Sequence, residues 1–147
     1  MPRGPVKGAY LLLLHIGDER SVPVGSLGTI RFDRGTYVYI GSAMGGLEQR
    51  VARHLRHEKR IRWHIDHLTA VSDGVEALLI PSQTDVECDL ASLIKSIPGA
   101  AGVAGFGCSD CRCRSHLFLV PEQVVKCLRA SFPDSLRRAG TRRQDAR

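Results

Sequence analysis

An uninterrupted apolar segment close to the N-terminus constrains the fold of this chain more than any other feature. Residues 7–16 read KGAYLLLLHI and include four consecutive leucines. A short apolar run of this kind, bounded by turn residues, is typical of a β-strand that is buried on both faces. We therefore predict a buried strand over residues 7–16.

The rest of the chain divides into further short strands and amphipathic helices. Strands are expected at residues 22–24, 29–32, 36–40, 75–80 and 116–120. Helices are expected at about residues 46–57, 60–71, 85–97 and 121–131. We predict one small α/β (α+β) domain over residues 1–131, with a mostly antiparallel central sheet flanked by helices. Residues 132–147 are polar and arginine-rich, and we expect a basic, flexible tail there.

Apolar spacing and glycine positions predict details of this arrangement. Ile61 and Leu93 are expected to lie on the buried faces of their helices. Gly41 is expected to end the strand before it, because glycine favours turns. The start of the second helix is expected to hold a packed polar network made of Trp63, His64 and Asp66.

Basic residues are concentrated in two segments, although the whole chain carries a net charge of only +6. Residues 46–62 and residues 129–147 each hold six Lys and Arg against two acidic residues. A solvated helix face and a disordered tail would explain both segments, and we prefer this interpretation for the tail. For residues 46–62 a nucleic-acid backbone is a reasonable partner, because arginine suits phosphate oxygens. The residues expected to contact it are Gly41, Arg53, His57, Lys59 and Arg60.

Membrane and export segments are not indicated by the sequence. The longest apolar run, residues 9–14, is far too short to span a bilayer. The first residues, MPRGPVKG, lack the apolar core of a signal peptide. We therefore expect a cytoplasmic protein without a membrane partner.

Two tyrosines, an arginine and a histidine are expected to lie close together. Tyr10 and Tyr39 lie on predicted strands, while Arg50 and His54 lie one turn apart on the helix that follows. Hydrolysis of a phosphodiester needs an activated water, positive charge at the phosphate and stabilisation of the leaving oxygen. A guanidinium can bind the phosphate, and a tyrosinate can act as base if neighbouring cations lower its pKa. The plainer interpretation is two half-buried strand tyrosines and an exposed helix arginine.

These residues resemble the motif of the GIY-YIG nuclease superfamily. The pairing of Gly8-Ala9-Tyr10 with Tyr39-Ile40-Gly41 is similar to the two halves of that motif, with Ala9 in place of the usual Ile. More narrowly, YIGSAMGGLEQR, RWHIDHL and GFGCSDCRCRSHLF resemble an uncharacterised prokaryotic GIY-YIG-like family. The resemblance covers residues 8–120 and implies a GIY-YIG-like fold.

The resemblance also implies a role for each residue of the site. Tyr10 would assist deprotonation of the nucleophile, and Tyr39 would support it. Arg50 would hold the phosphate, and His54 would hydrogen-bond nearby. Glu87, on a later helix, would bind the single divalent metal ion, Mg²⁺ or Mn²⁺. The implied activity is an endonuclease-like phosphodiesterase acting on DNA in repair or recombination, with RNA as the alternative substrate.

The spacing of the two tyrosines departs from the superfamily's pattern. Tyr10 and Tyr39 are separated by 28 residues, which is more than the usual short hairpin allows. Residues 22–32 must therefore form an additional hairpin or loop that leaves the two strands adjacent.

The metal-binding glutamate is the second departure. Glu87 lies about one turn earlier than the superfamily's pattern suggests, and Leu90 is nearer the expected position. Thr84 to Glu87 also reads as a capping box, in which Glu87 bonds back to the backbone N–H of Thr84. Metal ligand and helix cap are both open interpretations of Glu87.

Soft metal ligands are clustered before the last predicted strand. Three cysteines and a histidine occur within nine residues, namely Cys108, Cys111, Cys113 and His116. Ligands at this density bind zinc in many proteins. The spacing fits no common zinc-knuckle pattern, however, so we prefer burial of the cysteines as small apolar side chains and keep zinc as the alternative.

Two other functions are considered beside the nuclease. The chain could be a nucleic-acid-binding module of GIY-YIG descent with weak or no catalysis, or a small zinc-stabilised adaptor built around residues 108–116. The first alternative differs from the nuclease at Glu87. A nuclease needs this carboxylate beside Tyr10 and Arg50, whereas a binding module does not.

Overall fold

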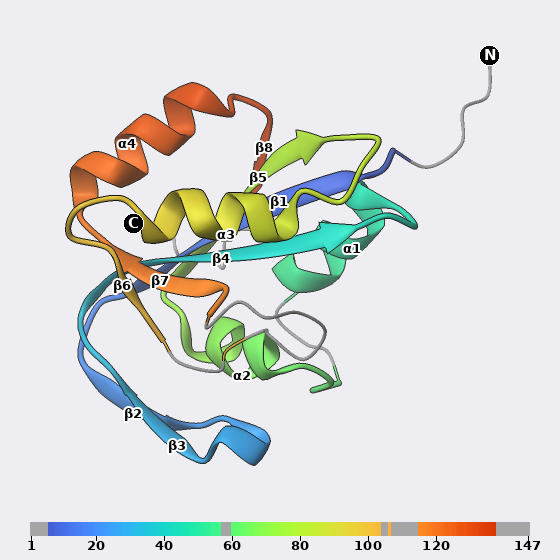
Figure 1. Ribbon diagram of the computed structural model, residues 1–147. Helices are drawn as coiled ribbons and strands as arrows, with labels where there is room; N and C mark the ends of the chain where they lie inside the picture. The colour runs from blue at the N-terminus through green and yellow to red at the C-terminus, as the bar shows by residue number, and fades with distance from the viewer. Residues whose placement is uncertain (1–5, 57–59, 104–105, 107–114, 138–147) are drawn as a thin grey trace, which may run out of the picture.

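The apolar segment near the N-terminus forms the centre of the sheet. The computed structural model describes residues 6–56, 60–103, 106 and 115–137. Within this part of the chain, strand β1 (Gly8–Ile16) pairs on one side with β4 (Gly35–Ala43) and on the other with β5 (Gly74–Pro81). Both pairings are antiparallel, and Figure 1 shows β1 crossing the middle of the molecule.

The outer strands complete a six-stranded antiparallel sheet in the described part of the chain. The strand order is β6-β7-β4-β1-β5-β8. The outer strands are β6 (Ala101–Gly102), β7 (Leu117–Val120) and β8 (Ser135–Arg137). The predicted α+β fold with an antiparallel central sheet is therefore confirmed.

Helices cover both faces of this sheet: α1 (Leu47–Leu55), α2 (His64–Val71), α3 (Glu87–Lys95) and α4 (Glu122–Ser131). Tyr10 and Leu12 of β1 belong to the core cluster that includes α1 and α2, while Leu11 and Leu13 belong to the cluster of α3 and α4. Successive side chains of a strand point to opposite faces, so the run of leucines supplies both cores. None of the described helices is long and apolar enough to cross a membrane.

The extra segment between the two tyrosine strands forms a separate hairpin. Strands β2 (Arg20–Pro23) and β3 (Thr29–Phe32) make a two-stranded sheet that projects below the main sheet in Figure 1, with a short 3₁₀ turn (η1, Gly25–Leu27) at its tip. The insertion leaves β1 and β4 paired, as predicted. Phe32 anchors the hairpin, because its side chain is fully buried with its ring edge-on to Tyr37.

Two predicted core residues are exposed instead. Ile61 is 46% exposed, because α2 begins at His64 and Ile61 lies in the segment before it. Leu93 is 57% exposed, whereas its neighbour Ile94 is buried. Adjacent helix residues point about 100° apart, so α3 turns Ile94 to the sheet and Leu93 to solvent.

The flexible tail was predicted to begin at residue 132, but residues 135–137 form a strand, β8. β8 pairs with β5, placing Leu136 opposite Ala77. The backbone N–H of Leu79 also donates to the carbonyl of Asp134 at 2.8 Å. The edge of β5 offers unpaired backbone groups, and a short strand satisfies them even in a polar sequence. Residues 138–147 lie outside the described part of the chain.

We expect Phe32→Ala to lower the free energy of unfolding by about 3–5 kcal/mol, because a buried aromatic ring would leave a cavity. Urea denaturation measures this change. The control is Ile61→Ala, which should change stability by no more than about 0.5 kcal/mol because Ile61 is exposed. A hairpin that merely rests on the surface would make the two substitutions equally mild.

Candidate active site

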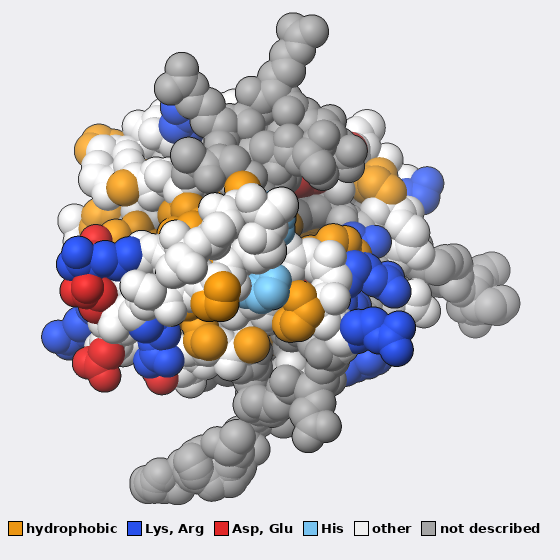
Figure 2. All heavy atoms as spheres, turned by 90° about the horizontal axis from the view of Figure 1, so that it is seen from below, with side chains coloured by type: hydrophobic (Ala, Val, Ile, Leu, Met, Phe, Trp, Pro, Cys, Tyr) orange, Lys and Arg blue, Asp and Glu red, His pale blue; other side chains and the backbone are white. Residues whose placement is uncertain are grey.

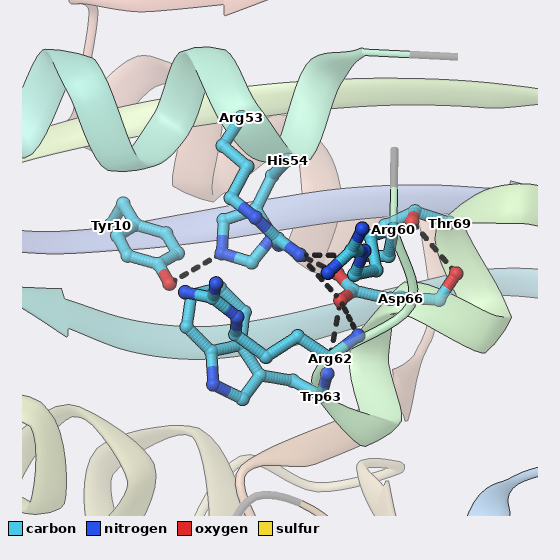
Figure 3. Close-up of polar contacts among 8 residues, drawn as sticks. All are labelled: Tyr10, Arg53, His54, Arg60, Arg62, Trp63, Asp66 and Thr69. Carbon is cyan, nitrogen blue, oxygen red and sulfur yellow. Dashed lines mark hydrogen bonds and ion pairs between the residues drawn. The ribbon is translucent and has the colours of Figure 1, made fainter. Parts of the chain in front are cut away.

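The hydroxyl of Tyr10 lies at the centre of the site. It shares a hydrogen bond of 2.7 Å with Nε2 of His54, which α1 holds above the sheet (Figure 3). Both side chains are buried, Tyr10 at 2% and His54 at 1% exposure. The ring of Tyr39 lies 6.3 Å from that of His54, so three predicted catalytic residues come together.

Gly41 makes room for Tyr10 rather than ending its strand. Strand β4 continues through Gly41 to Ala43, and Gly41 is the cross-strand partner of Tyr10. A Cβ atom at position 41 would overlap the ring and the hydroxyl of Tyr10. The predicted turn at Gly41 is therefore wrong, because the missing side chain serves a close approach within the sheet.

Arg50 lies on the same helix as His54, one turn earlier. Its Nη1 lies 3.4 Å from the carbonyl oxygen of Ser42, to which it donates. Its guanidinium carbon lies 5.0 Å from the centre of the Trp63 ring, within the range of a cation–π interaction. No described carboxylate forms an ion pair with Arg50, so its charge is available to an anion.

The environment of Tyr10 keeps its hydroxyl protonated. Burial raises the pKa of Tyr10, and the nearby Tyr39 and Glu87 raise it further, whereas the charge of Arg50 lowers it. Burial is the largest of these effects, so the net shift is upward. The condition for a tyrosinate base, a pKa lowered by neighbouring cations, is therefore not met at Tyr10.

Glu87 is the first residue of α3 and does not form the capping box. The backbone N–H of Thr84 donates to Oγ of Ser82, and that of Glu87 donates to Oδ1 of Asp85. The carboxylate of Glu87 instead lies with its Oε2 2.6 Å from Nδ1 of His116. The helix-cap interpretation is thus wrong. Glu87 also lies close enough to Tyr10 for its charge to affect the pKa of that hydroxyl.

Of the four residues considered as zinc ligands or buried side chains, the described part of the chain includes only His116. Cys108, Cys111 and Cys113 lie outside the described residues. His116 is buried and faces Glu87. Among the described residues, no three His, Cys, Asp or Glu side chains are grouped so that they could hold a metal ion.

The donor set at Glu87 fits a magnesium or manganese ion bound together with a phosphate. Mg²⁺ usually keeps several waters and takes one or two carboxylates plus substrate phosphate oxygens. The side chain of Glu87 is 22% exposed and supplies one such carboxylate. Arg50 lies near the same hydroxyl as Glu87 and could hold the phosphate. Leu90, which lies nearer the position where the glutamate was expected, is apolar and packs against the core.

Arg53 is committed to the protein rather than to a solvent-facing surface. Its Nη1 and Nη2 donate to the two oxygens of Asp66 at 3.0 and 2.9 Å (Figure 3). Its guanidinium also lies 4.3 Å from the centre of the Trp63 ring. Arg53 was predicted to contact nucleic acid, and the structure instead places it in the network that holds Trp63.

Asp66 is fully buried and accepts from the backbone N–H groups of Arg62 and Trp63 as well as from Arg53. Burial would raise the pKa of this carboxyl, but the hydrogen bonds from Arg53, Trp63 and Arg62 hold it below its ordinary value. The predicted network at the start of α2 is confirmed for Trp63 and Asp66. His64 instead lies 3.3 Å from Ser26.

Several arginines between α1 and α2 are exposed to solvent. His57 and Lys59 lie outside the described residues, while Arg56, Arg60 and Arg62 are exposed. In Figure 2, Lys and Arg side chains on the side opposite α1 are mixed with Asp and Glu, whereas those on the side where α1 lies in Figure 1 are gathered without acidic side chains among them. This surface is suited to a polyanion.

Sequence reasoning did not find the contact between Glu87 and His116. The two residues are far apart in sequence and were assigned to two separate metal sites. No periodicity or spacing joins them, because they meet through the packing of α3 against β4, the strand to which the backbone of His116 is hydrogen-bonded.

Comparison with protein families identifies a match over most of the chain. Residues 9–137 match the family described as Domain of unknown function DUF123. The chain therefore belongs to this family. Searches of curated proteins and of solved structures found no match.

We expect Gly41→Ala to lower the free energy of unfolding by about 1–3 kcal/mol, because the new methyl group would displace the Tyr10 ring. Thermal or urea unfolding measures the loss. Gly45→Ala is the matched control, since a Cβ atom there meets no neighbour within 4 Å. Equal stability of the two variants would contradict the close packing of Tyr10 on β4.

We expect Asp66→Asn to cost about 3 kcal/mol or more at neutral pH, because Arg53 would lose its buried counter-charge. The folded-state pKa of Asp66 is lowered, so its contribution to stability is complete above the ordinary value of 3.8 and is lost as the pH falls further. The stability difference between wild type and variant should therefore shrink below about pH 3.8.

Urea denaturation from pH 7 to pH 3 measures this difference, with exposed Asp18 changed to Asn as control. A difference that stays constant down to pH 3 would contradict the lowered pKa of Asp66.

Proposed function

We propose that this DUF123 protein is a divalent-metal-dependent phosphodiesterase of the GIY-YIG type that cleaves DNA. One observation carries the proposal. Tyr10 on β1 and His54 on α1 share a buried hydrogen bond, and Arg50 on α1 and Glu87 at the start of α3 lie close enough for their charges to act on the same hydroxyl. These side chains provide a proton-transfer pair, a phosphate-binding cation and a carboxylate for a metal ion, which are the parts that phosphodiester hydrolysis needs.

Descent from the GIY-YIG superfamily is supported by the register of β1 and β4 as well as by the sequence motif. The two motif halves lie on adjacent antiparallel strands, with Tyr10 opposite Gly41 and Leu12 opposite Tyr39. The pairing survives the inserted hairpin, and the arginine and histidine follow on the next helix. The two tyrosines, the arginine and the histidine must lie on such adjacent elements if they are to form one site.

Proton transfer in the proposed mechanism runs through Tyr10 and His54. Because Tyr10 stays protonated, its hydroxyl can donate its proton to an unprotonated Nε2 of His54 across 2.7 Å. The same phenolic oxygen then accepts a proton from the attacking water. His54 is thus the group that ends with the proton, and Tyr10 relays it.

Phosphate binding falls to Arg50. Its planar guanidinium can contact two phosphate oxygens at once, and Trp63 holds it beside the site. A Mg²⁺ or Mn²⁺ ion held by Glu87 would supply charge neutralisation at the phosphate and at the leaving oxygen. The exposed Arg56, Arg60 and Arg62 would contact the backbone on either side of the scissile bond.

DNA is the proposed substrate, with repair or recombination in the cytoplasm as the setting and RNA as the alternative. A nucleic-acid-binding module without catalysis is the second candidate. It is favoured by one observation, the engagement of Oε2 of Glu87 by His116, which leaves fewer carboxylate oxygens for a metal ion.

We expect wild-type protein to nick flap, branched or damaged DNA only when Mg²⁺ or Mn²⁺ is present. Tyr10→Phe, Arg50→Ala and Glu87→Gln should each lower the cleavage rate by about 100-fold or more, because each removes a group used in the transition state. Arg34→Ala, at an exposed turn beside the hairpin, is the control and should cleave normally.

Gel assays of cleavage and of DNA binding should be run on the same samples. Cleavage that survives all three substitutions would reject the site. Tight DNA binding by a wild-type protein that never cleaves would favour the binding module.

A further inference from the structure

His116 fixes one oxygen of the carboxylate on which the proposed metal ion depends. Its Nδ1 lies 2.6 Å from Oε2 of Glu87. The imidazole is buried at 1% exposure, whereas the Glu87 side chain is 22% exposed. One oxygen of the carboxylate is therefore held from the protein interior, and the group as a whole still reaches solvent.

The backbone holds His116 firmly in place. Its carbonyl accepts from the N–H of Ile40 on β4 at 2.9 Å. Its own N–H donates to the carbonyl of Phe106, also at 2.9 Å. Ile40 follows Tyr39 directly, so the position of His116 is tied to the strand that carries the second motif tyrosine. The imidazole therefore has a fixed position relative to the Tyr10 site.

A glutamate that begins a helix needs such a partner if it is to bind a cation well. Its side chain has several rotatable bonds, and fixing it costs conformational entropy. Carboxylates that bind metal ions are commonly held by a hydrogen-bonding neighbour, which orients the free oxygen. Nδ1 of His116 lies at ion-pair distance from Oε2, although its N–H does not point along the line of a hydrogen bond. This close contact restrains Oε2 from the interior, so that Oε1 is the oxygen left for the ion.

We propose that His116 is a positioning residue, which orients the Glu87 carboxylate for the divalent cation without binding the cation itself. This inference rests on the proposed function, because it assumes that Glu87 holds the metal ion. It assigns to His116 a task separate from the cysteine cluster in which its sequence spacing placed it.

The experiment measures Mn²⁺ affinity with a non-cleavable phosphorothioate DNA oligonucleotide present, because the site takes the ion together with a phosphate. Binding is followed by the loss of the free-ion electron paramagnetic resonance signal during titration, and the oligonucleotide alone is the blank. His116→Leu removes the nitrogen and keeps an apolar side chain of moderate size. His116→Asn keeps an amide nitrogen near the place of Nδ1. Glu87→Gln removes the proposed ligand, and His67→Leu repeats the histidine-to-leucine change on α2, away from Glu87 in sequence.

We expect His116→Leu to weaken Mn²⁺ binding by about 10–100-fold, the range found when the partner of a metal ligand is removed. His116→Asn should recover most of the affinity, and His67→Leu should bind as wild type does. Urea denaturation of each variant separates affinity from stability. Loss of stability in His116→Leu with unchanged Mn²⁺ affinity would overturn the positioning role and leave a structural one.

Electron spin-echo spectra of the bound Mn²⁺ supply the second readout. Positioning predicts no strong coupling to an imidazole nitrogen. A strong nitrogen coupling that disappears in His116→Leu would make His116 a ligand and would overturn the inference.

The two proposals can fail separately. If Mn²⁺ binding is lost in Glu87→Gln but unchanged in His116→Leu, only the positioning role of His116 is rejected. A wild-type protein that binds no Mn²⁺, or binds it equally after Glu87→Gln, rejects the metal-dependent function and the inference with it.

Discussion

The burial of the Tyr10 hydroxyl inside the domain is the constraint on which the site depends. A buried hydroxyl must find a hydrogen-bond partner, and His54 provides it at 2.7 Å. To place the ring there, β4 needs a residue without a side chain opposite Tyr10, and Gly41 meets this need. The glycine of β4 and the histidine of α1 thus meet one packing requirement, the burial of the Tyr10 ring and its hydroxyl.

A second network, made of Asp66, Arg53 and Trp63, determines which arginine of α1 lies free to face the Tyr10 hydroxyl. Asp66 is buried without solvent contact and binds Arg53, which in turn lies against Trp63. Trp63 also contacts His54 and Arg50, with ring centres of Trp63 and His54 5.6 Å apart. Arg53 therefore stabilises the fold through its ion pair with Asp66, whereas Arg50, one turn away on α1, can bind an anion. The two arginines differ because only Arg53 meets a buried carboxylate.

The sequence predicts the parts of this molecule that follow from local pattern. The leucines of residues 11–14 require a strand between two cores, and the spacing of Arg50 and His54 requires that they share one side of α1. What it does not predict depends on distant contacts. Nothing in the sequence distinguishes the roles of Arg50 and Arg53, because the difference depends on which of them lies beside Asp66 in the fold. The pKa of Tyr10 likewise depends on its burial more than on the cations beside it. Glu87 and His116 meet only through packing between α3 and the sheet.

The most direct test of a single phosphodiester site is a crystal structure of Glu87→Gln with a DNA oligonucleotide. We expect one phosphate in contact with the guanidinium of Arg50, beside the hydroxyl of Tyr10, with the flanking backbone along the exposed arginines between α1 and α2. A DNA backbone bound elsewhere, with Arg50 still turned to Ser42 and Trp63, would contradict it.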